Sequence, residues 1–282
     1  MTKERMDPEH GAGIDEASPE LAAIPGNENT FHFDPWWWLV ALVVSIIVLL
    51  IAFIPDPYKR IVLFVRDGIG VTLSTTVAAF LLVLVVGLVG GLGRLSTNRF
   101  VNGAATLYVE LIRGIPLLVQ LIWWYFAFPS VLNGIGQWLN IEALSRYKAN
   151  PILMAIIGLT ICYGAYMSEI YRAGIQSIPG GQMEAARSLG MSYFQAMRHV
   201  ILPQAVRVIL PPVGNEFISL LKDSSLVSVV AVADLTRRGR EFMSSTFLPI
   251  PTWTMVALIY LVMTLFSARM VSYIERRTHF DR

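Results

Sequence analysis

Residues 178–203 read IPGGQMEAARSLGMSYFQAMRHVILP and lie between two strongly apolar runs, yet they are too polar and too often interrupted to cross a bilayer themselves. Pro179 followed by Gly180 predicts that the helix arriving from the membrane ends here. A short helix is then expected over residues 182–189, and Gly190 is suited to close it. The first half of this stretch therefore predicts a short helix outside the membrane.

The second half of the stretch carries its own helix signals. Ser192 is followed three residues later by Gln195, which is the spacing of a capping box. Phe194 and Ile201 help to form an apolar face before Pro203, where we expect this second helix to end. The whole stretch predicts a helix-turn-helix at the membrane surface.

The first of these two helices has a face suited to docking. Ala185 and Ala186 leave a smooth surface that a partner can approach closely, and Glu184 and Arg187 place opposite charges beside it. An ordinary amphipathic connector between two membrane helices is the alternative interpretation.

The composition indicates a polytopic membrane protein. The 282 residues are 55% hydrophobic, and the mean hydropathy of +0.57 is far above that of a soluble domain. A single cysteine, Cys162, excludes an intramolecular disulfide and makes a metal site unexpected. The net charge is only +2, and the basic residues are spread among loops rather than gathered on one face. Both observations argue against a nucleic-acid partner.

The apolar runs predict six membrane spans. The run at 36–54 opens with three tryptophans suited to the membrane interface, and at ~1.5 Å per residue it is long enough to cross a ~30 Å hydrocarbon core. Gly114 and Pro116 predict a weak point in the third span. The acid-rich segment 1–34 is expected to be a disordered cytoplasmic tail. The other five spans are expected at 69–92, 103–128, 151–171, 205–232 and 252–274.

Six spans place both termini on one side, and this is the cytoplasmic side if 178–203 faces the cytoplasm. Basic residues are then only slightly more numerous inside than outside. Arg237, Arg238 and Arg240 fall outside, against the positive-inside rule.

Charged residues inside a bilayer are energetically expensive, so each is a candidate functional residue. Arg113 lies about 15 Å along the third span at ~1.5 Å per residue, near mid-membrane. Glu216 reaches a similar depth in the fifth span, and Tyr163 and Tyr166 do so in the fourth. These groups predict a pocket for a zwitterion. In this pocket Arg113 would bind a carboxylate in a bidentate contact, and Glu216 or Glu169 would bind an ammonium.

Structural ion pairs are the alternative for two of these charges. Arg113 follows Glu110 by three residues, and Arg172 follows Glu169 by the same spacing. Either pair could serve only to hold the helix surface together.

The sequence lacks the motifs of the common enzyme classes. No Gly-Lys dipeptide occurs, so there is no phosphate-binding Walker loop, and there is no HExxH, GxSxG or paired-cysteine pattern. We therefore expect no enzyme activity from the chain alone. Any ATP-driven work would need a separate subunit docked on 178–203.

From about residue 69 to the C-terminus the chain resembles the permeases of polar amino-acid ABC importers, the group that serves histidine, glutamate, glutamine, arginine and opines. Four stretches carry the resemblance: GIGVTLSTTV at 68–77, YVELIRGIPLLVQL at 108–121, YGAYMSEIYRAGIQSIPGGQMEAARSLG at 163–190 and ILPQAVRVILPPVGNEFISLLKDSSLVSVVAVADL at 201–235. Together they are much more specific than the EAA tripeptide alone.

The resemblance implies an all-α type I importer permease in the bacterial plasma (inner) membrane. Its five-helix core would occupy 69–274, with 36–54 as an added sixth helix. Two permease subunits, identical or homologous, would pair, and an extracytoplasmic amino-acid-binding protein would deliver the substrate. A dimer of ATP-binding cassette ATPases would bind MgATP, while this chain would hold no cofactor.

The resemblance also implies roles for particular residues. Glu184, Ala185, Ala186 and Gly190 match the loop that couples a permease to its ATPase, and Arg113 and Glu169 match positions expected to face the translocation path.

Two other classes remain as alternatives. An ion-coupled secondary transporter or channel would use Arg113 and Glu216 as ion or proton groups, but it would not need a docking stretch at 178–203. A structural membrane scaffold would not need charges at mid-membrane.

Overall fold

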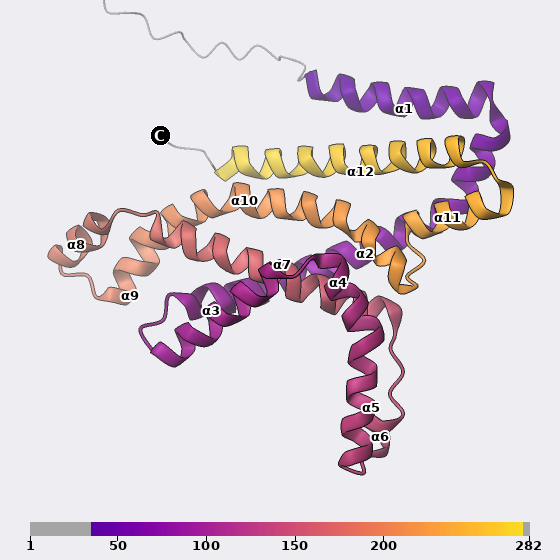
Figure 1. Cartoon of the computed structure of the whole chain (residues 1–282). Coiled ribbons are helices and arrows are strands. Elements are labelled where there is room, and N and C mark those ends of the chain that lie inside the picture. The colour runs from indigo at the N-terminus through magenta and orange to yellow at the C-terminus, as the bar shows by residue number, and fades with distance from the viewer. Residues whose placement is uncertain (1–34, 279–282) are drawn as a thin grey trace, which may run out of the picture.

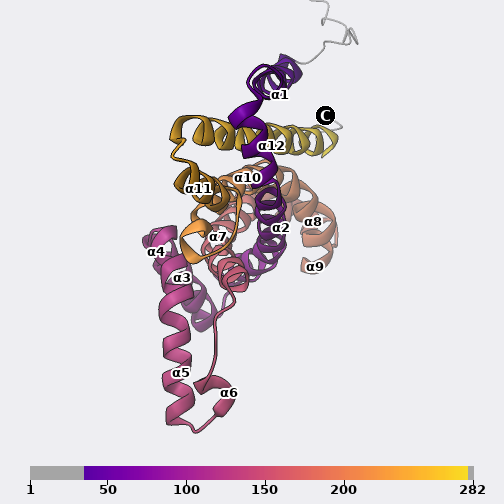
Figure 2. The ribbon, with the colours of Figure 1, turned by 90° about the vertical axis from the view of Figure 1, so that its right-hand side faces the viewer.

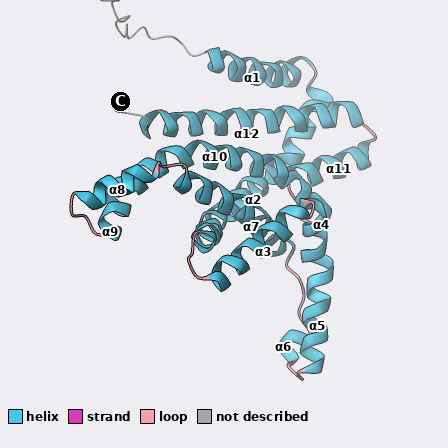
Figure 3. Ribbon diagram, turned by 60° about the vertical axis from the view of Figure 1, so that its left-hand side comes forward, coloured by secondary structure: helices cyan, strands magenta, loops and turns pink. Residues whose placement is uncertain are grey.

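The computed structural model describes residues 35–278, and every regular element in that range is a helix (Figures 1 and 3). The predicted all-α membrane fold is thus confirmed, whereas the tail expected at 1–34 lies outside the described residues. The α-helices are α1 Pro35–Phe53, α2 Pro55–Arg94, α3 Arg99–Gly114, α4 Leu117–Ile122, α5 Phe128–Trp138, α6 Glu142–Ser145, α7 Pro151–Gln176, α8 Gly180–Ser188, α9 Tyr193–Ala196, α10 Leu202–Asp223, α11 Leu235–Thr246 and α12 Pro249–Thr278. Two π-helical turns, Trp123–Ala127 and Met197–Ile201, and a 3₁₀ helix, Ser224–Val230, join some of them.

Five helical stretches among the described residues have the length and hydropathy to cross a membrane. The spans expected at 36–54, 151–171 and 252–274 are among them, and 69–92 forms part of the 40-residue helix α2. The five stretches are Trp36–Phe53, Pro55–Arg94, Leu117–Trp138, Pro151–Gln176 and Pro249–Arg276.

The third predicted span, 103–128, is wrong as a single helix. Helix α3 ends at Gly114 and α4 begins at Leu117, with Ile115 extended between them at φ −107° and ψ 131°. The ring of Pro116 disfavours helical backbone at the preceding residue, so the chain turns where the weak point was expected. The apolar stretch that is long enough to span runs instead from Leu117 to Trp138.

The fifth predicted span, 205–232, is shorter than expected. Helix α10 ends at Asp223, where the polar sequence Lys222-Asp223-Ser224 interrupts the apolar run. The Ser224 hydroxyl donates to the carbonyl of Leu221 at 2.7 Å as the chain tightens into the 3₁₀ helix. Helix α10 is not among the five apolar stretches although its 22 residues are long enough, because polar residues such as Arg207, Asn215 and Glu216 lower its hydropathy.

The centre of the bundle is the contact between α2 and α7. Ala79 and Val83 of α2 and Leu159 and Met167 of α7 are all fully buried in it. Three glycines of α2 face α7 here, at positions 87, 90 and 91. A Cβ atom on Gly91 would lie 2.9 Å from the Ser168 carbonyl oxygen and 2.9 Å from the Tyr171 Cβ, so only glycine permits this approach.

Helix α1 lies outside this centre and runs beside α12 (Figure 1). Its Ile47 packs on a second core cluster that includes Leu235 and Met255. The indole N–H of Trp36 donates to the Leu265 carbonyl of α12 at 3.4 Å. The helix predicted as an addition to the core therefore packs along its edge.

The two ends of the bundle differ. Helices α8 and α9 form one end and α11 lies at the other, as Figure 1 shows. Helices α5 and α6 project away from the bundle in both Figures 1 and 2. The surface helices are thus divided between opposite ends.

Replacing Gly91 by alanine should destabilise the bundle, because the new methyl group would overlap backbone and Cβ atoms of α7. Overpacking of this kind costs about 1–3 kcal/mol, and the midpoint of thermal unfolding in detergent should fall by several degrees. Gly70→Ala is the matched control, because it lies in the same helix and a Cβ there meets nothing within 4 Å. Equal unfolding temperatures for the two variants would contradict this account of the α2–α7 contact.

Candidate functional site

The first helix of the surface end formed by α8 and α9 lies where the sequence predicts, within two residues. Gly190 has φ +86°, a left-handed conformation that favours glycine. Its N–H donates to the Arg187 carbonyl at 3.0 Å, and the N–H of Met191 donates to the Ala186 carbonyl at 3.2 Å. This pair of hydrogen bonds is a Schellman motif, which satisfies carbonyls at the end of α8.

The capping box at the start of α9 is confirmed. The Gln195 N–H donates to the Ser192 hydroxyl at 3.3 Å, and the Ser192 N–H donates to the Gln195 side-chain oxygen at 2.8 Å. The expected end of this second helix at Pro203 is wrong, because the chain continues through the turn Met197–Ile201 directly into α10. Pro203 is the second residue of α10 and directly follows the π-helical turn, so its missing N–H interrupts the hydrogen-bond series without ending the helix.

The exposed part of this end is more apolar than the sequence analysis expected. Ala185 is exposed, but Ala186 is only 4% exposed and faces the protein. Leu189, Tyr193 and Phe194 are exposed by 81%, 59% and 71%. Their position beside a glycine turn is the signal that could have identified them as contact residues.

A cavity of about 240 Å³ lies between α4, α7 and α10. It contains three of the predicted site residues, Tyr163, Tyr166 and Glu216. The Tyr163 hydroxyl donates to an Asp223 carboxylate oxygen at 2.7 Å, which holds Asp223 at the cavity. The lining consists of Leu117, Cys162, Tyr163, Tyr166, Glu216, Ser219 and Asp223.

Arg113 lies at the edge of this cavity. Its guanidinium carbon is 5.1 Å from the centre of the Tyr166 ring, a cation–π contact. Arg113 is close enough to Glu169 and Glu216 to attract both carboxylates electrostatically. Glu110, its suggested structural partner, contacts Arg94 at 3.8 Å.

Glu169 belongs to a separate ion-pair cluster. Arg94 of α2 donates to the Glu169 carboxylate at 2.5 Å, and Arg172 pairs with the same carboxylate. The pair between Glu169 and Arg172 is the structural alternative that the spacing suggested. Sequence reasoning missed Arg94, because the predicted span ended at residue 92, whereas α2 continues to Arg94 itself.

The break between α3 and α4 is held by one side chain. The Gln120 amide donates to the carbonyls of Ile112 and Ile115, both at 2.8 Å, and these carbonyls have lost their helical partners. Backbone polar groups at membrane depth need such partners. Gln120 thereby fixes the end of α3, from which Arg113 reaches Tyr166.

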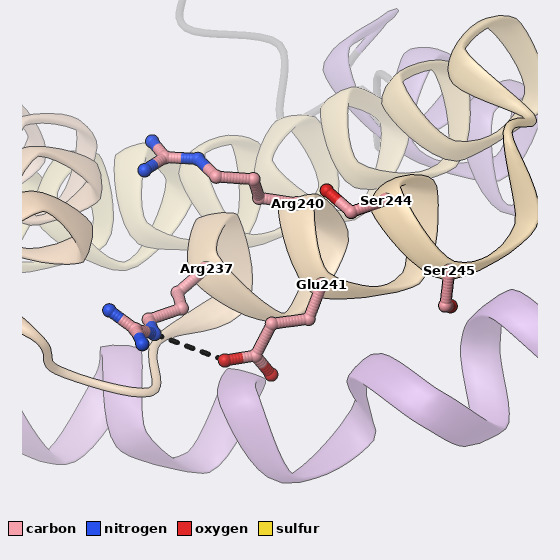
Figure 4. Close-up of a pocket in the computed structure, with 5 residues that line it drawn as sticks. All are labelled: Arg237, Arg240, Glu241, Ser244 and Ser245. Atoms are coloured by element: carbon pink, nitrogen blue, oxygen red, sulfur yellow. Dashed lines mark hydrogen bonds and ion pairs between the residues drawn. The ribbon is translucent and has the colours of Figure 1, made fainter.

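The opposite end of the bundle carries a polar pocket on α11 (Figure 4), with a volume of about 590 Å³. Arg238 donates to Asp67 of α2 at 2.6 Å and to Glu241 at 2.8 Å, and Glu241 also accepts from Arg237 at 3.0 Å. The hydrogen bond from Arg238 lowers the pKa of the Glu241 carboxyl below its usual range. The arginines that seemed out of place by the positive-inside rule are therefore partly neutralised.

Within residues 35–278, no group of three or more His, Cys, Asp or Glu side chains is arranged to hold a metal ion. Sequence reasoning also missed the place of Asp223 and Ser219 in the cavity. The available signal was the spacing of seven residues between Glu216 and Asp223, which puts both on one face of α10.

Comparison with known proteins places this architecture in a family. Residues 83–280 match the family described as "Binding-protein-dependent transport system inner membrane component". The chain is 39% identical to the arginine transport system permease protein ArgU of Corynebacterium glutamicum, over 75% of this chain and 66% of the relative. It is 36% identical to the glutamine transport system permease protein GlnP of Escherichia coli, over 75% of this chain and 91% of the relative.

A solved structure with the same fold supports this placement. The crystal structure of an amino acid ABC transporter with histidines matches with a TM-score of 0.68 and 39% identity, over 78% of this chain and 96% of that chain. The family match at residues 83–280 includes the helices that line the cavity and the α8–α9 end. This chain belongs to the family of binding-protein-dependent transport system inner membrane components.

Proposed function

We propose that the chain is the permease subunit of an ATP-driven importer for a polar amino acid, and that the cavity between α4, α7 and α10 lies on its translocation path. Relatives named as arginine, glutamine and glutamate/aspartate permeases support this class of cargo. The observation that carries the proposal is Arg113 at the edge of a cavity lined by Glu216, because this pair matches the two charges of a zwitterion.

The partners follow from the two ends of the bundle. The α8–α9 end, with Glu184, Ala185 and Gly190, docks on an ATP-binding cassette ATPase that binds MgATP, and Leu189 and Phe194 supply exposed apolar contacts. Ala186 supports this surface from inside. This end and both termini face the cytoplasm. An extracytoplasmic binding protein approaches the α11 end, and a second permease, identical or homologous, completes the path.

Continuous backbone links the docking end to the cavity. Helix α9 passes through the turn Met197–Ile201 into α10, which carries Glu216 and Asp223. Helix α7, which carries Tyr163 and Tyr166, leads directly into α8. A movement imposed on α8 and α9 by an ATPase would therefore move both walls of the cavity.

Ion-coupled secondary transport or a channel is less well supported. Neither class needs the exposed, well-capped α8–α9 end, and the relatives are transport-system permeases rather than ion-coupled carriers.

Substitution of Gly190 by valine should abolish ATP-coupled uptake while membrane insertion is retained. A β-branched residue at φ +86° is strained by roughly 1–3 kcal/mol, so the turn between α8 and α9 would rearrange. Uptake and ATPase stimulation should be measured in proteoliposomes with the partner ATPase and loaded binding protein. Glu184→Lys should give the same loss.

Gly181→Ala is the matched control for this experiment, because Gly181 lies in the first turn of α8 and a Cβ there meets nothing within 4 Å. It should transport normally. Unaltered stimulation of the ATPase in Gly190→Val would contradict the coupling role.

Arg113→Ala and Glu216→Gln should each raise the transport constant for the amino acid about 10- to 100-fold. Loss of a hydrogen bond to a charged group is worth ~1.5–3 kcal/mol, and each 1.4 kcal/mol is tenfold. The measurement is uptake over a range of substrate concentrations with variants that still assemble. Arg146→Ala, which removes an exposed ion pair with Glu142 in the α6 segment, should leave the constant unchanged.

Wild-type transport constants in both cavity variants would exclude the cavity from the translocation path.

A further inference from the structure

An apolar pocket of about 270 Å³ lies between α2, α10 and α12, and every residue in its lining is apolar. It runs along α10 from Leu210 to Phe217, a length of about 10 Å at ~1.5 Å per residue. Phe80 of α2 meets Phe217 edge to face, with the ring centres 4.9 Å apart. Met270 and Ile274 of α12 are exposed by 47% and 43%, so the pocket is open to the surroundings of the bundle.

This apolar pocket faces neither the cavity between α4, α7 and α10 nor helix α1. Leu210 and Phe217 are seven residues apart and share one face of α10, whereas Glu216 is on the face that lines the cavity. On α12, the Arg269 guanidinium is turned toward α1, where it lies 5.9 Å from the centre of the Trp37 ring. The apolar pocket is therefore left to whatever surrounds the bundle in the membrane.

The apolar pocket lies toward the α8–α9 end of the bundle. Helix α10 begins at that end and α12 ends there, as Figure 1 shows. Leu210 is eight residues from the first residue of α10, and Ile274 is four residues from the last residue of α12. At ~1.5 Å per residue these separations are about 12 Å and about 6 Å. An acyl chain of one leaflet, which extends over half of the ~30 Å hydrocarbon core, reaches this depth from that end.

Arg207 lies between the apolar pocket and this end of the bundle. It precedes Leu210 by three residues and Gly214 by seven, so all three share one side of α10. Arg207 is exposed, and no hydrogen bond or ion pair engages its side chain within residues 35–278. A charge at membrane depth is costly unless it reaches the headgroup region or meets an opposite charge. An anion at the mouth of the pocket would supply that opposite charge.

We propose that an acidic phospholipid binds here, with one acyl chain in the apolar pocket and its phosphate on Arg207. An arginine guanidinium forms bidentate hydrogen bonds with phosphate oxygens, and the apolar lining matches hydrocarbon. A helix from a second copy of the chain could fill the pocket, but it would leave Arg207 without an anion. Basic residues beside pockets between membrane helices recognise acidic headgroups on the cytoplasmic side, which is where the proposed function puts this end. The site does not depend on which substrate the importer carries.

The test is photo-crosslinking of the delipidated permease–ATPase complex in detergent. Phosphatidylglycerol with a diazirine at the end of one acyl chain is bound and irradiated, and the label is located by peptide mass spectrometry. We expect the label on residues 210–217 and 270–274. Unlabelled phosphatidylglycerol should displace the probe at about fivefold lower concentration than phosphatidylcholine with the same chains, because one arginine near an acidic headgroup contributes about that factor.

The role of Arg207 is tested by the ratio of the two competitors. Arg207→Gln should bring this ratio close to one, and Arg207→Lys should keep most of the preference for phosphatidylglycerol. Arg66→Gln is the matched control, because Arg66 is also exposed but lies on α2 near the α11 end, and it should leave the ratio unchanged. Phosphatidylglycerol should also raise the midpoint of thermal unfolding of the wild-type complex more than that of Arg207→Gln.

The role of the apolar pocket is tested by filling it. Val77 lines the pocket and is 46% exposed, so Val77→Trp places a large side chain there without entering a packed core. This variant should lose most of the label at residues 210–217. Leu82→Trp is the matched control, because Leu82 is 47% exposed on the same helix and does not line the pocket, and it should be labelled as the wild type is.

Several results would overturn the inference. These are equal displacement by the two lipids in the wild-type complex, a wild-type ratio in Arg207→Gln, wild-type labelling in Val77→Trp, and a label confined to other helices. Absence of label together with a crosslink between two permease copies through residues 210–217 would assign the pocket to a contact between subunits instead. Each of these results would leave the proposed transport function standing, because that function rests on the cavity and the α8–α9 end.

Discussion

The close contact of α2 and α7 is the interaction on which the rest of the structure depends. Lipid tails are as apolar as leucine side chains, so helices in a bilayer associate through close packing rather than through exclusion of water. Gly87, Gly90 and Gly91 supply that packing by letting the backbone of α7 approach α2. Because α7 carries Tyr163 and Tyr166, this contact also fixes one wall of the cavity. A site of charged and aromatic groups is therefore positioned by residues that have no side chain.

The second constraint is the need to satisfy backbone polar groups at membrane depth. Pro116 breaks the helix between α3 and α4, which frees the carbonyls of Ile112 and Ile115, and the Gln120 amide binds both. The break ends α3 one residue after Arg113. A helix end that would otherwise be costly thus becomes the place where a cation meets the edge of the cavity.

Features set by local chemistry were predictable from the sequence. The turn at Gly190, the capping box at Ser192 and the weak point at Pro116 follow from backbone preferences of single residues, and the apolar runs gave most of the spans. Features set by three-dimensional packing were not predictable. Nothing local shows that Arg94 would bind Glu169 across two helices, or that Ala186 would face inward while Ala185 faces outward. The cavity was predicted only in part, because placing Asp223 in it required the length of α10 to be known.

The position of α1 beside α12 has a consequence for biosynthesis. Membrane segments enter the bilayer in the order in which they are synthesised, so the first described helix packs against the last described helix, which is made much later. Until α12 is made, α1 lacks its contacts with that helix, and the indole of Trp36 has no Leu265 carbonyl to bind. Closure of this edge of the bundle thus has to await α12, and a nascent chain that stops before α12 leaves this side of α1 exposed to lipid or to other membrane proteins.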